Sequence, residues 1–115
     1  MVRTLTICFV DPDPIRIQAF LGAHLPGGLW SLLAQEYYGA GFLGLRICPS
    51  RKTPGMFALI GTWTSTDSMA AARRAPAFRV LEQFQRNLTI STIGCGAFRV
   101  PAASTGGGVN QAEFT

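Results

Sequence analysis

The sequence has little charge and almost no histidine. Charged residues make up 14% of its 115 residues, hydrophobic residues make up 48%, and one histidine is present. No apolar run approaches the roughly 18 residues that a membrane span needs, and the N-terminus lacks a charged segment followed by a cleavable apolar one. We therefore expect a soluble, cytoplasmic protein with no membrane contact.

Cysteine is scarce too, and its spacing excludes several kinds of site. Cys8, Cys48 and Cys95 are odd in number and far apart, which gives neither a disulfide framework nor a CxxC metal pair. We expect buried, reduced thiols. The sequence also shows no Ser-His-Asp order, paired carboxylates, phosphate loop or metal-ligand cluster, so hydrolysis and metal catalysis have little support.

The basic residues are dispersed. The net charge is +4, but the only adjacent pairs are Arg51-Lys52 and Arg73-Arg74, and no basic run of five or more occurs. We therefore expect no nucleic-acid partner. The low charge instead favours a chain that buries extra surface against a partner or around an apolar ligand.

Periodicity predicts strands at 4–10, 42–48, 56–64 and 89–100, with helices at 14–24, 29–38 and 66–87. Asp13 and Pro14 are typical of a helix start, and Pro76 should interrupt the last helix. The order β-α-β-β-α-β predicts an α+β, ferredoxin-like domain over 1–100 with a four-stranded antiparallel sheet. We expect 101–115 to be a flexible tail, or an arm laid on a neighbour.

Both faces of this sheet should be apolar. Strand three offers Phe57, Leu59 and Trp63 on one side and Met56, Ala58 and Ile60 on the other. The corresponding sets in strand two are Phe42, Gly44 and Cys48 against Leu43, Leu45 and Ile47. Because the helices cover one face only, a second copy of the sheet is the simplest cover for the other, and we expect a homodimer.

The stretch LIGTWTSTDSMAAARRAPAF, from Leu59 to Phe78, resembles the strand–helix signature of the antibiotic biosynthesis monooxygenase family, and GAGFLGLRICPS is similar to its Gly-Phe second strand. The resemblance implies a dimeric α+β barrel with one pocket per subunit, between helices and sheet. The family includes cofactor-independent monooxygenases of aromatic polyketides, haem-degrading oxygenases, and proteins with isomerase or cyclase roles.

Three departures from the family pattern bear on function. The polyketide oxygenases often carry Asn four residues before the strand-three Trp, where this chain has Leu59. The haem-degrading branch uses a His on helix two, where this chain has only Arg73 and Arg74, so haem is disfavoured and we expect no cofactor. Pro26-Gly27-Gly28 also interrupts the first helix, which changes one wall of the pocket.

Trp63 and His24 are the candidate catalytic residues. Trp63 would stack on a planar substrate, although it could equally be a core aromatic. His24 could remove a phenolic proton as a general base, producing an electron-rich anion that reacts with oxygen. The more frequent role for a histidine at this position is to contact the last carbonyls of its helix.

The candidate substrate-binding residues are aromatic, small or cationic: Trp30, Tyr37, Arg46, Phe57, Leu59, Gly61 and Phe78. Glycine inside a strand leaves room for a ligand, or else marks a bulge. Arg46 would bind an anionic substrate or form a salt bridge across a dimer, for instance to Glu36 or Asp67. One of Trp30, Tyr37 and Tyr38 should line the pocket.

Three hypotheses about function follow. The first is a small cofactor-independent monooxygenase acting on a hydrophobic, polyketide-type aromatic. The second is a non-oxidative cyclase or isomerase on the same scaffold, for which Leu59 is the argument. The third is a ligand-binding dimer without turnover.

Overall fold

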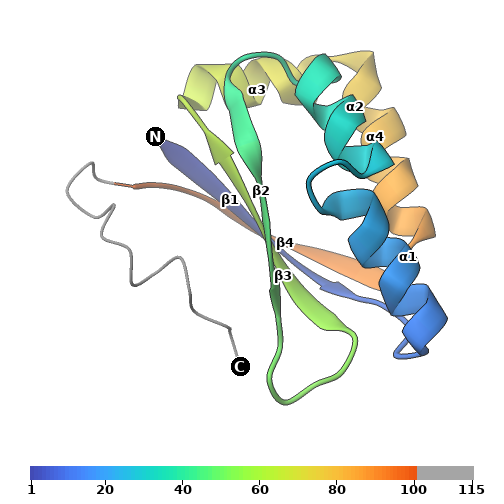
Figure 1. Cartoon of the computed structure of the whole chain (residues 1–115). Coiled ribbons are helices and arrows are strands. Elements are labelled where there is room, and N and C mark those ends of the chain that lie inside the picture. The colour runs from blue at the N-terminus through green and yellow to red at the C-terminus, as the bar shows by residue number, and fades with distance from the viewer. Residues whose placement is uncertain (101–115) are drawn as a thin grey trace.

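The computed structural model describes residues 1–100, which form one sheet and four helical segments (Figure 1). The elements in chain order are β1 (Val2–Phe9), α1 (Pro14–His24), α2 (Leu29–Tyr37), β2 (Phe42–Pro49), β3 (Met56–Trp63), α3 (Thr66–Arg74), α4 (Pro76–Asn87) and β4 (Ser91–Arg99). The predicted segment 101–115 lies outside the described residues.

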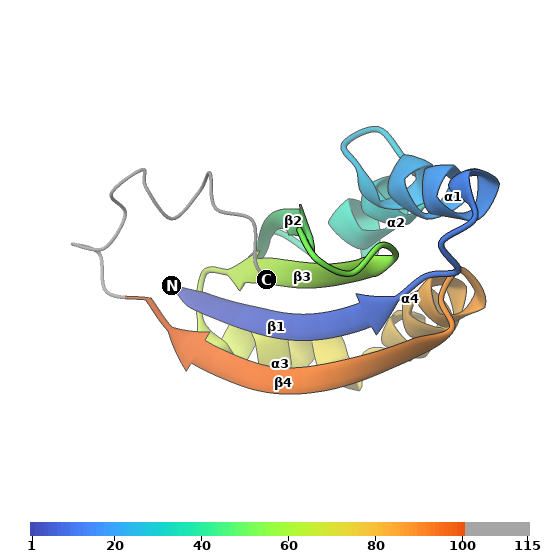
Figure 2. The same ribbon diagram turned by 90° about the horizontal axis from the view of Figure 1, so that it is seen from below.

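The four strands form an antiparallel sheet in the order β2-β3-β1-β4. Figure 1 shows all four helices on the same side of this sheet, and Figure 2 shows the curvature of the strands from below. The predicted α+β, ferredoxin-like class is therefore confirmed. Its physical basis is the general preference for right-handed crossovers, which places both helical connections on one face.

Local sequence sets the helix ends. The Asp13 carboxylate accepts the Ile15 backbone N–H at 3.1 Å, with Pro14 in the first helical position. α3 begins with a capping box in which Ser65 and Ser68 satisfy each other's backbone N–H groups. Pro76 cannot donate to the preceding turn, so the predicted helix over 66–87 divides into α3 and α4.

Two β-bulges set which side chains face the helices. In β2, Phe42 pairs with Trp63 and Gly44 pairs with Thr62, which leaves Leu43 as an extra residue. The predicted alternation in strand two is therefore wrong: Phe42 shares the helix-covered face with Leu45, and not with Gly44. In β4, Cys95 is the extra residue, between Gly94 and Gly96.

The core lies between the sheet and the helices. Its largest fully buried side chains are Phe20, Leu81, His24 and Cys8. Phe20 packs on Phe57 with ring centroids 5.1 Å apart, which ties α1 to β3. Within 1–100, no helix is long and apolar enough to cross a membrane.

The other face of the sheet has no helix over it (Figure 1). Ile93 is 55% exposed and Phe98 is 50% exposed, and both belong to β4. Leu5, Ile7 and Ile60 alternate with the pocket-lining Thr4, Thr6, Leu59 and Gly61, so they lie on this uncovered face and are partly buried.

Candidate functional site

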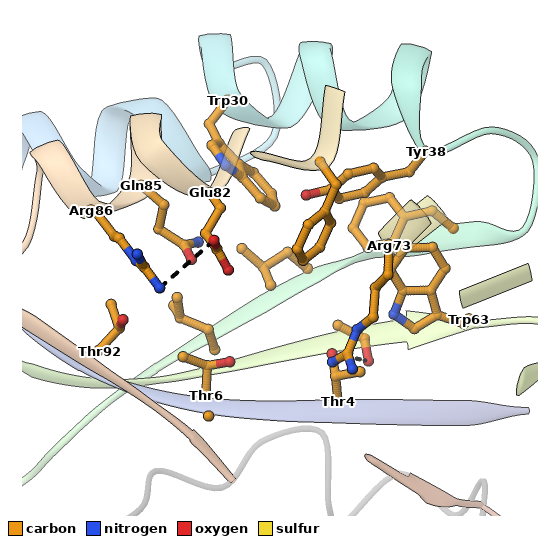
Figure 3. Close-up of a pocket in the computed structure, with 16 residues that line it drawn as sticks. Thr4, Thr6, Trp30, Tyr38, Trp63, Arg73, Glu82, Gln85, Arg86 and Thr92 are labelled. Atoms are coloured by element: carbon orange, nitrogen blue, oxygen red, sulfur yellow. Dashed lines mark hydrogen bonds and ion pairs between the residues drawn. The ribbon is translucent and has the colours of Figure 1, made fainter. Parts of the chain in front are cut away.

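A pocket of about 340 Å³ opens between the sheet and helices α2, α3 and α4. Figure 3 shows side chains reaching it from the helices above and from the strands below. Its lining consists of aromatic, small, hydroxyl and charged residues: Thr4, Thr6, Trp30, Tyr38, Phe42, Leu45, Leu59, Gly61, Trp63, Arg73, Phe78, Glu82, Gln85, Arg86, Thr92 and Gly94.

Tyr38 is the centre of the aromatic wall. Its ring centroid lies 5.2 Å from Phe42, 5.4 Å from Trp63, 6.0 Å from Phe78 and 6.2 Å from Trp30. These are the tilted and edge-on arrangements that aromatic pairs prefer. The five rings come from α2 and its C-cap, from α4 and from two strands, so packing fixes their positions before any ligand binds.

Trp63 ends β3 at one side of the pocket and is 4% exposed. Its indole Nε1 is buried and has no hydrogen-bond partner within residues 1–100. Gly61 lies two residues earlier on the same face. A Cβ there would stand 2.7 Å from Thr4 Oγ1 and 3.5 Å from Trp63 Nε1, so only glycine fits without displacing a neighbour.

Charged and polar side chains line the rest of the pocket. Arg86 pairs with Glu82 at 3.7 Å on the partly exposed side of α4. Burial raises the pKa of Tyr38 to about 12, the Glu82 carboxylate adds to this rise, and the Arg73 guanidinium opposes it. Tyr38 is therefore a neutral phenol at physiological pH. Figure 3 shows Arg73 and Trp63 at one end of the pocket, and Gln85 and Arg86 at the other.

Behind the pocket, His24 joins α1 to α2 and α4. Its Nδ1 lies 2.8 Å from the Phe20 carbonyl and its Nε2 lies 3.2 Å from Gln85 Nε2. The imidazole stacks on Trp30 with centroids 5.0 Å apart, and the Trp30 indole donates to the Leu81 carbonyl at 3.1 Å. Burial lowers the pKa of His24, and its contact with the Phe20 carbonyl opposes that shift.

Comparison with known proteins rests on structure, because no family model and no curated protein matches the sequence. SnoaB, a cofactor-independent oxygenase from Streptomyces nogalater, superposes with a TM-score of 0.61 at 17% identity, covering 87% of this chain and 92% of that one. A protein from Deinococcus radiodurans, described as a candidate antibiotic biosynthesis monooxygenase, gives 0.60 at 13% identity, with 88% and 93% covered. A similarly described protein from Caulobacter crescentus gives 0.62 at 11%, with 87% and 89% covered.

The chain has the fold of the antibiotic biosynthesis monooxygenases. The resemblance seen from Leu59 to Phe78 is thus confirmed at the level of fold. Sequence identities of 11–17% establish a shared fold and do not establish a shared reaction. What the pocket does must be argued from its own residues.

Several residues predicted for the site line this pocket: Trp30, Leu59, Gly61, Trp63 and Phe78. Leu59, which stands where the polyketide oxygenases of this family often carry Asn, is 3% exposed and gives the pocket an apolar floor. Of the three candidate aromatic residues around α2, Trp30 and Tyr38 face the pocket. Tyr37 points away and is 53% exposed.

The structure leaves four predicted residues, including Tyr37, outside the lining. His24 lies behind Gln85, and its contact with the Phe20 carbonyl matches the alternative of a helix-end histidine. Phe57 packs into the core against Phe20. Arg46 is exposed on the opposite face of the sheet, where it pairs with Ile60. The bulge at Leu43 is the reason that Arg46 does not share a face with Phe42.

Sequence reasoning missed most of the polar lining. Glu82 and Arg86, which pair with each other on α4, both line the pocket. The spacing of Phe78, Glu82, Gln85 and Arg86, at three and four residues, is the signal that places them on one stripe of α4. Thr4, Thr6 and Thr92 could have been found from the polar face of their strands.

The described residues contain no group of three or more His, Cys, Asp or Glu side chains placed to hold a metal ion. The three cysteines are free thiols. Cys8 and Cys48 are buried as predicted, and burial raises the pKa of Cys8 to about 12. The prediction is wrong for Cys95, which is exposed because it lies in the edge strand β4, where every residue except Thr92 is exposed.

Proposed function

We propose that this chain is a small cofactor-independent monooxygenase that acts on a hydrophobic, polyketide-type aromatic substrate. The observation that carries the proposal is the aromatic wall around Tyr38, inside a cavity of about 340 Å³. A wall of aromatic rings that a planar substrate can stack against is what such a ligand requires. The fold shared with SnoaB, a cofactor-independent oxygenase, supports the same reading.

The pocket offers groups for forming and holding an anion. Glu82 supplies a carboxylate in the lining and is the candidate proton acceptor. Arg73 brings positive charge to the Trp63 end, where an anionic phenolate or enolate would be stabilised (Figure 3). His24 was expected as the base, but it has no place in the lining, and we assign it a different role below.

The chemistry balances without an added reductant. Deprotonation of a reduced polycyclic phenol gives an electron-rich anion, which transfers an electron to O₂. Oxygen then bonds to the ring carbon, and loss of water leaves a ketone. A CH₂ group and one O₂ thus become a C=O group and one H₂O, so the substrate supplies all the electrons. The pocket's part is to bind, orient and ionise the substrate.

Oxygen uptake tests this proposal. The assay uses the purified chain, the reduced phenol dithranol, and no added flavin or metal, in an oxygen electrode. Trp63→Leu should lower the rate at least tenfold by removing part of the stacking wall. Tyr37→Leu, an exposed aromatic change outside the pocket, should leave the rate unchanged. No enzyme-dependent oxygen uptake by the wild-type chain would overturn the proposal.

The apolar floor at Leu59 favours a second candidate, a non-oxidative cyclase or isomerase. Leu59 lines the pocket but supplies no hydrogen-bonding side chain at the position where the polyketide oxygenases often carry Asn. Mass spectrometry separates the two reactions, because a cyclisation without loss of water, or an isomerisation, gives a product of unchanged mass. A chain that binds dithranol but changes nothing would be a ligand-binding protein.

We also propose a homodimer built through the uncovered face of the sheet. Exposed Ile93 and Phe98 on β4, together with the alternate residues Leu5 and Ile7 on β1, give this face an apolar character that suits a second copy. Light scattering should give twice the 12.4 kDa chain mass, and Ile93→Glu should shift it toward one chain. A monomeric wild type would refute this part of the proposal.

A further inference from the structure

A short hydrogen-bond chain runs from the buried end of α1 into the pocket. It begins at the Phe20 carbonyl, passes through both nitrogens of His24, and ends at the side-chain amide of Gln85. His24 is 1% exposed, and Gln85 is half-buried and lines the pocket. Figure 3 shows the Gln85 amide reaching into the pocket from α4, close to Glu82.

The chemistry of the chain fixes the direction of each hydrogen bond. A carbonyl oxygen can only accept, so His24 Nδ1 carries the proton that it donates to Phe20. In a neutral imidazole the other nitrogen, Nε2, then has only a lone pair, and burial lowers the pKa of His24 so that the neutral form prevails at pH 7. Nε2 must therefore accept a hydrogen bond from the Gln85 amide nitrogen, 3.2 Å away.

The orientation of Gln85 follows from this. With the amide nitrogen turned to His24, the carbonyl oxygen Oε1 is left on the other side of the amide group. Within residues 1–100, no hydrogen bond uses Oε1 of Gln85. A flipped amide would set its oxygen against the lone pair of His24 Nε2 and lose the bond.

We propose that His24 is a positioning residue that holds the Gln85 carbonyl oxygen toward the pocket, so that the pocket selects ligands with a hydrogen-bond donor at that end. The donor would be a hydroxyl or an amine on the aromatic ligand. This inference rests on the proposed function in one respect only, namely that the ligand is aromatic.

The two ends of the pocket then differ in kind. The Gln85 end offers a neutral acceptor beside Arg86, whose charge is paired with Glu82 at 3.7 Å, while the Arg73 end offers positive charge and N–H donors (Figure 3). A planar ligand with a hydroxyl on one side and a carbonyl or anionic oxygen on the other fits this polarity in one orientation. The arrangement would thus fix which edge of the ligand faces Glu82.

The tautomer can be observed directly, because His24 is the only histidine in the chain. Nitrogen-15 NMR of the imidazole at pH 7.5 should show one protonated nitrogen, Nδ1, and one unprotonated nitrogen, Nε2. A neutral imidazole with its proton on Nε2 would lose the bond to the Phe20 carbonyl and reverse the bond to Gln85, and it would overturn the proposal.

Ligand selection is tested with two probes that differ in one hydrogen-bond donor. 2-Naphthol carries a hydroxyl, and 2-methoxynaphthalene carries an acceptor only. Tryptophan fluorescence quenching under nitrogen gives their dissociation constants without turnover. The wild type should prefer 2-naphthol by about threefold to tenfold, the range of one net hydrogen bond.

Two variants should abolish this preference, and one should keep it. Gln85→Met removes the acceptor at nearly constant size. His24→Phe keeps ring stacking with Phe20 and Trp30 but releases the Gln85 amide, so both probes should bind with similar affinity. Gln83→Met is the matched control, because Gln83 is exposed on the same helix and bonds only to Asn87.

The outcomes separate this proposal from the proposed function. A preference for 2-naphthol that persists in Gln85→Met and His24→Phe would overturn the role of His24 while leaving an oxygenase intact. Failure of oxygen uptake would leave the binding preference in place. If neither probe binds to the wild type, the proposed role of His24 and Gln85 is overturned, while the oxygenase proposal is still decided by oxygen uptake with dithranol.

Discussion

The Gly61→Ala substitution is the most direct test of how the floor of the pocket is packed. The added methyl group would stand 2.7 Å from Thr4 Oγ1, 3.5 Å from Trp63 Nε1 and 3.8 Å from Phe42 Cε1. Ordinary contact begins near 3.4 Å, so the Thr4 hydroxyl must retreat by about 0.7 Å. Because threonine is branched at Cβ, its side chain has few alternative rotamers to adopt.

The expected magnitude has two parts. Overpacking of this kind costs about 1–3 kcal/mol of the free energy of unfolding. Replacing glycine also reduces the conformational freedom of the unfolded chain, which stabilises the folded state by about 0.4–1 kcal/mol where alanine fits the backbone. Gly61 does not have a left-handed φ, so the backbone itself is compatible. Gly61→Ala should therefore lower stability by about 0.5–2 kcal/mol.

Gly94→Ala is the matched control. Gly94 lines the same pocket, has no left-handed φ, and a Cβ there would meet no atom within 4 Å. This variant should gain about 0.4–1 kcal/mol from the unfolded-state effect alone. Urea unfolding, followed by circular dichroism at equal protein concentrations, gives both values. Equal stability of the two alanine variants would refute the close packing deduced around Gly61.

Three further predictions concern titration and capping. Tyr38→Phe should remove the phenolate absorbance that rises near pH 12, measured by ultraviolet titration of the folded protein, since burial raises this pKa; an unchanged titration curve would contradict the burial. Because the folded pKa of His24 lies below 6.5, the unfolded chain binds a proton first, so stability should fall as the pH drops below 6.5. His24→Phe should remove this part of the pH dependence, measured by urea unfolding between pH 5 and 7.5; an identical slope in both proteins would show that another group is responsible. Ser65→Ala should lower stability by about 1 kcal/mol through loss of the α3 cap, measured by thermal unfolding, and a change below a few tenths would mean that the cap contributes little.

The fold could be predicted because its signals are local. Alternation in β1 and β3, the Asp13-Pro14 helix start and the Pro76 break each depend on a few neighbouring residues. The same holds for Trp63 and Gly61, which lie on one face of a regular strand. Periodicity is enough to place such residues relative to one another.

The rest of the site depends on features without a local signal. The bulge at Leu43 reverses the face of every later residue in β2 relative to Phe42. As a result Leu45 lines the pocket, where Arg46 had been predicted. His24 and Gln85 are 61 positions apart, and they meet because α1 and α4 both pack against α2. The spacing of the polar residues in α4 places them on one face of the helix. A charged helix face is usually solvated, so the sequence alone could not predict that this face lines the pocket.

Cys95, which the β4 bulge leaves outside the regular ladder, is an exposed thiol that can be labelled. The chain's two other thiols are buried, so a maleimide dye should modify a single position in the native protein. Attached there, the dye would report on its surroundings in β4 from a strand that also carries Ile93 and Phe98. Labelling speed as a function of protein concentration would then reveal whether another polypeptide shields that strand.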